Sequence, residues 1–380
     1  MITYKYKLYR THRTKYLDKM LAEACFVWNH ALALQKRYYR IYHKYIDAYK
    51  IQKHFDKRFK RVFLHSHTRQ EIFQRIDKIY KNFFNHLCKR PPKFRKENNF
   101  YSIVFKGYGG YSIKDNNFVI NRIKKKFKFY KNREINRTIK QISLKRNRLG
   151  EYFICIVTDA EPKKYGKSHN GASIGIDFGL KTYLTLSNGT RYDNPQYMKE
   201  SLTELRRRSR NLSRCKKGSN NRERKRKELD RLWNDITNRR NDFQWKLAHE
   251  LCRKYDNIFI EDLNLADMNL GRKANRKLKD QAHAEFITKL QYVATKYDVV
   301  IHKINRYYPS SKTCTCGYIN RELKLTDRKW VCPHCGAVHD RDLLAANNIL
   351  RRGIYELESC SKTGKQIVGW QQRYHPTISL

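Results

Sequence analysis

Three acidic side chains in the second half of the chain have the type and spacing that metal-dependent hydrolysis needs. Asp177 and Glu261 each end a short apolar run, and Asp342 lies at the expected start of the last helix. A charged group at the end of a buried strand is costly unless it binds something. Two Mg²⁺ ions about 3.5–4 Å apart can drive phosphodiester hydrolysis, and Mg²⁺ prefers carboxylate oxygens to His or Cys. The sequence therefore predicts that Asp177, Glu261 and Asp342 bind two Mg²⁺ ions and form a catalytic site.

Ordinary structural roles compete with this interpretation. Asp177 could belong to a turn or cap a helix, Glu261 could be solubilising charge, and Asp342 could be a helix N-cap. Asp340 also competes with Asp342 for the third position. The run Ile174–Leu180 resembles the first phosphate loop of sugar kinases and actin-like ATPases, but that resemblance leaves the basic charge and the cysteines of the chain unexplained.

Four of the ten cysteines lie close together in the sequence, as the pairs Cys314/Cys316 and Cys332/Cys335. Clustered cysteines in a basic intracellular protein are typical of metal ligands and not of a disulfide framework. They predict one structural Zn²⁺ in a two-hairpin zinc ribbon. The Cys-X-Cys spacing of the first pair strains a shared tetrahedral geometry, so His334 could replace one thiolate. A segment of about 25 residues cannot bury a core, so the metal would supply its folding energy.

The charge of the chain indicates a nucleic-acid partner. The 380 residues include 83 Lys and Arg against 35 Asp and Glu, a formal net charge of +48, with 27 Tyr and 18 Phe. Cations bind phosphates, and aromatic rings stack on unpaired bases. No apolar run approaches the roughly 20 residues that span a bilayer, no long helix has one clean apolar face, and the N-terminus lacks a signal-peptide core. We expect a cytoplasmic prokaryotic protein, associated with the nucleoid when it acts, with no membrane partner and no small-molecule substrate.

The elements that must position these residues follow from the apolar periodicity. In the first part of the chain, alternation predicts strands at 2–9, 101–105, 118–120 and 152–157. From about residue 15 a helical period replaces it, with Leu17, Leu21, Ala24, Trp28 and Ala31 on one face and Ile72, Ile76, Ile79, Phe83 and Leu87 on another. Pro91-Pro92 ends this region. A helical segment is thus inserted into a small β domain that contains turn glycines at Gly107 and Gly109-Gly110.

The second half follows a linker around 165–171. It is predicted to contain strands at 172–178, 182–187, 257–260 and 299–304 and helices at 200–254, 280–297 and 343–350. Asn188-Gly189 predicts a two-residue hairpin. Between Arg206 and Arg231 the helical stretch is dominated by Arg and Lys, which could be a solvated helical hairpin. The net charge favours a nucleic-acid-binding face instead, with contacts from Arg206, Arg207, Arg208, Arg210, Lys225 and Arg226.

Several motifs together resemble the TnpB family, the transposon-encoded relatives of type V CRISPR nucleases. The matching stretches of the second half are Gly175–Lys181, Ile260–Leu263, Tyr308–Cys314, Trp330–Gly336, His339–Asp342 and Ala345–Ile349. In the first half, Ser66, Gln70 and the run Asp77–Phe84 are similar to the family's recognition helix, and Pro92–Arg95 matches less specifically. By this resemblance, the catalytic set falls on Asp177, Glu261 and Asp342, and Ser66 and Gln70 are expected to contact nucleic acid. The Cys-X-Cys pair departs from the family pattern.

The resemblance implies an α+β multidomain fold with a RuvC-like, ribonuclease-H-like α/β nuclease domain. The expected domains are a wedge β-barrel at 1–14 and 93–168, an inserted helical recognition domain at 15–92, the nuclease domain at 169–306 and 337–355, an inserted zinc ribbon at 307–336, and a C-terminal tail at 356–380.

The resemblance also implies an RNA-guided DNA endonuclease that uses a guide RNA and cuts target DNA beside a short flanking motif. We expect a monomer in the ribonucleoprotein. Some family members have lost catalytic acids and act as RNA-guided repressors. All three acids are present here, which favours cleavage over binding without cleavage. A strand-transfer transposase is a further alternative, because similar sites perform that chemistry.

Overall fold

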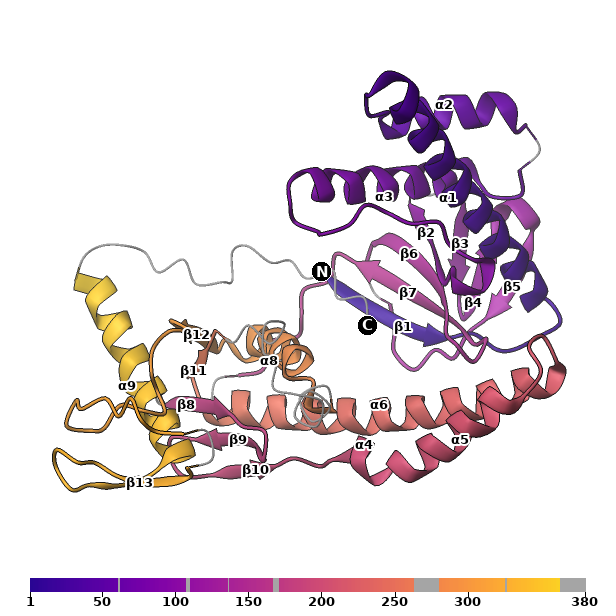
Figure 1. Ribbon diagram of the computed structural model, residues 1–380. Helices are drawn as coiled ribbons and strands as arrows, with labels where there is room; N and C mark the ends of the chain where they lie inside the picture. Colours follow the sequence, from indigo (N-terminus) through magenta and orange to yellow (C-terminus); the bar gives the residue numbers. More distant parts are fainter. Residues whose placement is uncertain are drawn as a thin grey trace. The chain divides into compact units, whose positions relative to one another are not determined.

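The computed structural model describes residues 1–60, 62–106, 110–135, 137–166, 171–262, 280–324 and 327–362 (Figure 1). It contains two compact units, one formed by Met1–Glu161 and the other beginning at Pro162. Four features predicted above lie wholly or partly outside the described residues: the turn glycines Gly107 and Gly109, the linker from 167 to 170, Leu263 of the second acidic motif, and the tail from 363 onwards.

The first unit is built on two antiparallel sheets. The first has the strand order β1-β7-β6-β2, and the second has the order β3-β4-β5. The first sheet consists of β1 (Ile2–Lys7), β7 (Tyr152–Thr158), β6 (Ile139–Arg146) and β2 (Ser102–Lys106). The second consists of β3 (Tyr111–Lys114), β4 (Asn117–Ile120) and β5 (Lys125–Lys128). Ile2 lies opposite Thr158, so the first strand of the unit is paired with its last.

Three helices lie between β1 and β2 in the sequence: α1 (Thr14–Tyr42), α2 (Ala48–Arg58) and α3 (Ser66–Phe84). The face of α1 predicted from the period is buried, from Leu17 to Ala31, and packs in one core with Ile72 and Ile76 of α3. Leu87 does not share that face, because α3 ends at Phe84 and Leu87 is 74% exposed.

The second unit contains a five-stranded sheet of order β10-β9-β8-β11-β12. Its strands are β8 (Ser173–Phe178), β9 (Thr182–Leu186), β10 (Arg191–Asp193), β11 (Asn257–Glu261) and β12 (Val300–Ile304). β8, β9 and β10 are antiparallel neighbours, whereas β11 runs parallel to both β8 and β12. A hairpin at Asn188-Gly189 is confirmed, since it joins β9 to β10, but its loop has three residues, 187–189, and not two: Leu186 pairs with Thr190, and Gly189 takes the positive φ of +87°.

Helices cover both faces of this sheet. The described helices of this unit are α4 (Tyr197–Glu200), α5 (Leu202–Arg214), α6 (Asn220–Lys254), α8 (His283–Tyr297) and α9 (Arg341–Lys362), and α6, α8 and α9 are the ones that pack on the sheet. Ile174, Ile176, Ile258 and Ile260 face a core made by α6 and α8. The alternate residues, which include Phe259, face α9. A short hairpin of β13 (Lys329–Val331) and β14 (Val338–Asp340) leads directly into α9.

Two helices differ from the prediction. The stretch predicted as one helical region at 200–254 is broken between α5 and α6, because Gly218 adopts φ +84° and the hydroxyl of Ser219 caps α6 by accepting the amide of Arg222. α9 continues to Lys362, well beyond Leu350, because Ile354 and Leu357 extend its apolar face against the core around Phe259. The mixed α/β composition predicted from the sequence is confirmed. Among the described helices, none combines the length and the apolarity required to cross a bilayer.

Candidate metal centres and nucleic-acid interface

Asp177 and Glu261 are neighbours in the sheet. β8 and β11 pair in parallel with Ile176 opposite Ile260, so the next residues on the two strands are Asp177 and Glu261. Paired residues of adjacent strands point to the same face, and the strands lie about 4.8 Å apart. The two carboxylates therefore lie side by side at the carboxyl ends of two central strands, on the face covered by α9.

Asp342, the second residue of α9, comes from a third element. α9 lies directly on β8, because Gly175 has no side chain there: a Cβ at Gly175 would overlap the carbonyl oxygen of Ala346 and lie 2.8 Å from the amide nitrogen of Leu350. Further along, a Cβ at Gly353 would overlap the ring of Phe259. These two close approaches hold the helix against β8 and β11.

Asp177 interacts electrostatically with both of the other carboxylates. Burial, then repulsion from Glu261, then repulsion from Asp342 raise the pKa of Asp177 to about 7, and Arg341 opposes the shift. Burial also raises the pKa of Glu261, while a hydrogen bond from Ser310 opposes that shift. Crowded carboxylates of this kind suit a site that binds a divalent cation.

Asp340 and Asp342 have different surroundings. The Oδ1 atom of Asp340 accepts the amide of Leu343 at 3.1 Å, and Oδ2 pairs with Arg191 at 2.9 Å. Burial raises the pKa of Asp340, but these partners outweigh it and lower the pKa overall. Asp340 is therefore the residue that caps α9. Asp342 pairs with Arg328 at 3.0 Å and acts electrostatically on Asp177, so its carboxylate belongs to the acidic group.

Ser310 contacts the acidic group and Asn348 contacts Ser310, and neither residue was selected from the sequence. The hydroxyl of Ser310 donates a hydrogen bond to Oε1 of Glu261. The side-chain amide of Asn348 donates to the backbone oxygens of Ser310 and Thr313. Both residues lie inside motifs that the family resemblance had marked, Tyr308–Cys314 and Ala345–Ile349, which is the one signal that could have identified them.

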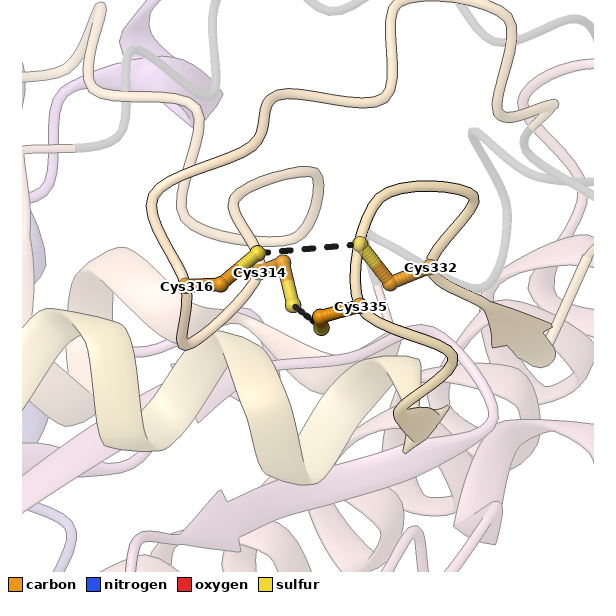
Figure 2. Close-up of side chains that lie close together, drawn as sticks. All are labelled: Cys314, Cys316, Cys332 and Cys335. Atoms are coloured by element: carbon orange, nitrogen blue, oxygen red, sulfur yellow. Dashed lines mark hydrogen bonds between the residues drawn. The ribbon is translucent and has the colours of Figure 1, made fainter.

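The four clustered cysteines are brought together (Figure 2), and the ligand atoms of the group lie within 4.8 Å of one another. The Sγ atoms of Cys314 and Cys335 are 3.5 Å apart, and those of Cys316 and Cys332 are 3.8 Å apart. Zinc–sulfur bonds of about 2.3 Å in a tetrahedron place sulfur atoms about 3.8 Å from one another. The thiol positions therefore fit a tetrahedral metal despite the Cys-X-Cys spacing.

Two histidines lie near this cluster. His334, considered above as a replacement ligand, is not a member of the four-cysteine group, and its ring stacks on that of Tyr318. The Nε2 atom of His339 lies 3.0 Å from Cys314 Sγ, and its ring packs on Trp330. Burial opposes ionisation of Cys314, but the backbone of Cys316 and the side chain of His339 lower its pKa to about 5. In the same group, hydrogen bonds from the backbone of Tyr318 and Ala337 lower the pKa values of Cys316 and Cys335, but desolvation and hydrogen bonds with neighbouring thiols outweigh them, so both pKa values are raised.

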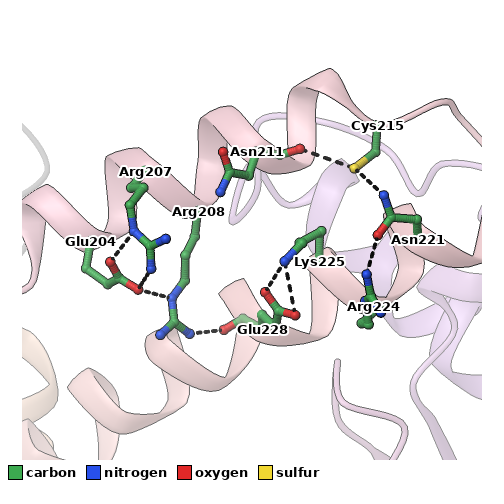
Figure 3. A network of polar contacts seen from close by, with 9 residues as sticks. All are labelled: Glu204, Arg207, Arg208, Asn211, Cys215, Asn221, Arg224, Lys225 and Glu228. Atoms are coloured by element: carbon green, nitrogen blue, oxygen red, sulfur yellow. Dashed lines mark hydrogen bonds and ion pairs between the residues drawn. The ribbon is translucent and has the colours of Figure 1, made fainter.

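The basic hairpin, which we define as α5 and α6 up to Arg231, neutralises much of its own charge (Figure 3). Arg207 and Arg208 both bind Glu204, at 2.7 and 2.5 Å, and these hydrogen bonds lower the pKa of Glu204 to about 2. Lys225 pairs with Glu228 at 3.0 Å, and Arg226 pairs with Glu223 and Asp230. Four of the six predicted nucleic-acid contacts are thus engaged with carboxylates of the hairpin.

Arg206 and Arg210 are different. Both are exposed, and no carboxylate within the described ranges of the chain pairs with either of them. They line a groove of about 600 Å³ whose other walls are Met198, Leu202, Leu205, Ser209, Leu229 and Trp233. The indole of Trp233 is 38% exposed.

Ser66 and Gln70 lie in the first turns of α3, in the first unit. Ser66 is exposed and Gln70 is half-buried. Asp77, on the same helix, accepts a hydrogen bond from the hydroxyl of Tyr45 and pairs with Lys81. Asp77 therefore has a structural role within the helical segment, whereas the contacts expected of Ser66 and Gln70 stay predictions.

Comparisons with known proteins cover the second half of the chain. Residues 155–286 match the OrfB_IS605 family, described as "Probable transposase", and residues 283–349 match the family "Cas12f1-like, TNB domain". A protein of Streptomyces pristinaespiralis, provisionally named an RNA-guided DNA endonuclease, is 36% identical over 214 residues, 56% of this chain and 52% of that protein. InsQ of Escherichia coli K12, with the same provisional assignment, is 27% identical over 59% of each chain.

TnpB-like protein L79 of Acanthamoeba polyphaga mimivirus is 30% identical over 222 residues, 53% of this chain and 41% of that protein. The chain thus spans about half the length of these relatives. Among solved structures, the Cas12f1–sgRNA–target DNA complex matches with a TM-score of 0.56 over 90% of this chain and 83% of that chain. The sequence identity is 17%, so this likeness concerns the fold.

Proposed function

The chain belongs to the TnpB family, and from this premise we propose that it is a transposon-associated, RNA-guided DNA endonuclease. We propose that Asp177, Glu261 and Asp342 form the active site that cleaves the DNA. One observation carries the proposal: Asp177 and Glu261 end two strands that pair in parallel, on the face that packs against α9, and Asp342 is the second residue of that helix. Burial, and then repulsion from Glu261 and Asp342, raise the pKa of Asp177 to about 7, which supports this arrangement. Asp340 is engaged by Arg191 and by the amide of Leu343, whereas Asp342 pairs with Arg328 and also acts on Asp177. Carboxylates that repel one another indicate a cation-binding site.

The donor set fits Mg²⁺. Three carboxylates supply hard oxygen atoms, and a magnesium site is commonly completed by water and by phosphate oxygens of the substrate. Asp177, Glu261 and Asp342 would hold two ions, which when bound activate the attacking water and stabilise the leaving oxygen. We infer that the sheet and its helices form a RuvC-like, ribonuclease-H-like nuclease domain around this site.

The fold of this chain sets the positions and orientations of the three carboxylates. Asp177 and Glu261 stand on adjacent parallel strands, so their separation is set by the hydrogen-bonded ladder and not by a loop. At the start of α9, the ion pair with Arg328 orients the side chain of Asp342. The three side chains would thus direct several carboxylate oxygens to one side of the site, and a phosphodiester would have to approach from that side.

The cysteine cluster would hold one structural Zn²⁺. It contains four thiols at tetrahedral spacing, with no vacant ligand position for substrate. The cluster lies between β12 and α9 in the sequence, so the metal would fold the segment that delivers Asp342 to the other two acids.

Guide RNA and target DNA are the proposed partners. The net charge of +48 can offset many phosphates. A chain of 380 residues that pairs an RNA with its target can leave sequence reading to base pairing, while the protein reads duplex shape and a short flanking motif. A related protein in the Cas12f1 complex binds an sgRNA and a target DNA, and this chain shares its fold.

The test is to purify the full-length protein with its copurifying RNA, replace the guide segment of that RNA, and challenge the complex with old and new targets. Cleavage should move to the new target, provided that the flanking motif is kept, and the Asp177→Ala protein should bind the new target without cutting it. RNase-treated protein that still cuts the original site with the same specificity would show a protein-read nuclease or transposase instead.

A further inference from the structure

The contact between Ser310 and Glu261 is placed where it can control the metal centre. Ser310 lies between β12 and the cysteine cluster, and its side chain is buried. Its hydroxyl donates to Oε1 of Glu261. A donor to one carboxylate oxygen fixes the orientation of the carboxylate and leaves the second oxygen available for another ligand.

Asn348 fixes Ser310 in turn. The Nδ2 atom of Asn348 donates to the backbone oxygen of Ser310 at 2.8 Å and to that of Thr313 at 2.6 Å. Asn348 is 3% exposed, so both carbonyl groups would be left without their partner in a nearly dry environment if the amide were removed. Asn348 lies on α9, six residues after Asp342, which is a rise of about 9 Å along the helix. The orientation of Glu261 is therefore linked to the helix that carries Asp342.

We propose that Ser310 is the positioning residue of the acidic metal centre, and that Asn348 holds it to α9. Ser310 selects the rotamer of Glu261 that faces Asp177 and Asp342. The backbone oxygen of Ser310 contacts Asn348 of α9, so Ser310 acts on the metal only through Glu261. The inference rests on the proposed function, because the orientation of Glu261 matters only if the group binds a cation.

The experiment measures Mg²⁺ binding by the full-length protein without using cleavage. The melting temperature is followed as Mg²⁺ is added, and the Mg²⁺ concentration at half of the total shift is compared among variants. Ser310→Ala should raise this concentration by roughly 10–100-fold, the usual effect of removing a partner of a metal ligand. Ser310→Thr, which keeps the hydroxyl, should restore most of the affinity. Target-DNA binding in Mg²⁺-free buffer should be the same for all of them.

Two matched controls isolate the proposed contact. Ser311→Ala removes a neighbouring hydroxyl for which the structure records no contact with Glu261, and Asn347→Ala removes an amide that bonds only Leu343 of its own helix. Both should titrate like the wild type, whereas Asn348→Ala should shift in the direction of Ser310→Ala. A Ser310→Ala protein with the wild-type Mg²⁺ midpoint would overturn the positioning role. A wild-type protein that Mg²⁺ does not stabilise would overturn the metal centre itself, and this inference with it.

A separate observation concerns the groove beside the basic hairpin. Its walls are mostly apolar and include an exposed indole, and the two arginines that line it, Arg206 and Arg210, are among the cations of the hairpin that pair with no carboxylate in the described part of the chain. They lie four residues apart on α5, which places them on one face of the helix. An exposed ring in the same groove as two guanidinium groups matches a base with its flanking phosphates, because the ring can stack and the cations can bind the backbone.

We infer that this groove binds an unpaired nucleotide of single-stranded nucleic acid, with the base on Trp233 and the backbone on Arg206 and Arg210. The inference rests on the proposed function, which supplies such strands as a displaced DNA strand or as unpaired RNA. The paired cations of the hairpin, such as Arg207, contribute less, because binding a phosphate would require them to leave Glu204.

The probe is a short labelled polythymidine strand, with a hairpin duplex of the same length as comparison, added to full-length protein. Trp233→Ala should weaken binding of the single strand roughly five- to a hundredfold and leave duplex binding unchanged. Trp233→Phe should recover most of this affinity. Arg206→Ala with Arg210→Ala should flatten the log–log salt dependence by roughly 0.7 for each phosphate that the protein no longer neutralises, and Arg207→Ala should flatten it much less.

The outcomes separate the groove from the nuclease. If Trp233→Ala binds the strand as the wild type does, the groove assignment is wrong. That result would not affect the assignment of the cleavage site, which is tested separately by the variants of its acidic residues. If Trp233→Ala instead alters the oligomeric state measured by light scattering, the groove seats a second copy of the chain and the nucleotide site is refuted.

Discussion

Replacing Asp177 by Asn should make the metal-free protein more stable while it abolishes cleavage. The pKa of Asp177 is raised from 3.8 to about 7, a shift of about 3 units. Each unit corresponds to about 1.36 kcal/mol, so ionising Asp177 in the folded protein costs up to about 4 kcal/mol at pH 8. Relaxation of the half-buried site makes this figure an upper limit. Asn has nearly the same shape and no charge, so the variant avoids this cost.

The pH dependence follows from the direction of the shift. Because the folded-state pKa lies above the unfolded-state value, the cost is absent below about pH 4 and grows as the pH rises to 7 and beyond. The gain of Asp177→Asn over the wild type should therefore be small near pH 4 and largest near pH 8. In a unit of about 200 residues, 4 kcal/mol corresponds to a rise in melting temperature of at most roughly 8–16 °C.

The assay is calorimetric unfolding of full-length protein in Mg²⁺-free buffer without chelator, so that metal bound to the cysteines is retained. Adding Mg²⁺ should stabilise the wild type and have much less effect on the variant. Asp262→Asn is the matched control: Asp262 pairs with Lys303 at 2.9 Å and Arg306 at 2.7 Å, so its removal should destabilise the protein slightly. If Asp177→Asn is no more stable than the wild type at pH 8, neither burial nor repulsion from Glu261 and Asp342 disfavours the ionised form of Asp177, and the electrostatic account of the site is wrong.

Further outcomes are expected at the other sites. Glu261→Gln should reduce cleavage by more than about a hundredfold with little change in DNA binding, because removing a direct metal ligand costs more than removing an outer partner; single-turnover cleavage and filter binding measure both. Asp342→Asn should impair cleavage more than Asp340→Asn, which should mainly cost about 1 kcal/mol of helix capping; the reverse order would exchange their roles. Elemental analysis should find one zinc per chain, and Cys332→Ser should lose it and become protease-sensitive between 307 and 340. Neutralising Arg206 and Arg210 should weaken binding of all targets alike and lower its salt dependence, which titrations at several salt concentrations would show.

Local patterns predicted much of the second unit. Apolar runs marked β8, β9, β11 and β12, and Asn188-Gly189 marked the hairpin, because these features depend on residues near one another in the sequence. The convergence of Asp177 and Glu261 was inferred from the order of the elements, and the parallel pairing of their strands is consistent with it. The length of α9 was underestimated because its later apolar residues contact Phe259, a partner more than 90 residues away.

The ion pairs of the basic hairpin could have been read from the sequence. Glu204 precedes Arg207 and Arg208 by three and four residues, and Glu223 precedes Arg226 by three, which are the spacings of neighbours on a helix. Counting cations without counting these partners assigned equal importance to Arg207 and Arg210. The Ser310–Glu261 hydrogen bond, by contrast, joins residues 49 positions apart from different elements, and only a three-dimensional arrangement could show it.

α9 explains why Asp342 and the cysteine cluster are neighbours in the sequence. The helix carries Asp342 at its start, holds Ser310 and Thr313 through Asn348, and packs on β8 and β11 where glycines permit close approach. A helix keeps these points at constant separations, whereas loops would let each acid move independently. Metal-assisted hydrolysis needs ligands held to within about 0.5 Å of their productive positions. Because Thr313 directly precedes Cys314, we expect folding of the cysteine cluster to be coupled to alignment of the three acids. Removing the metal bound by the cysteines should therefore displace the side chains of Glu261 and Asp342 first.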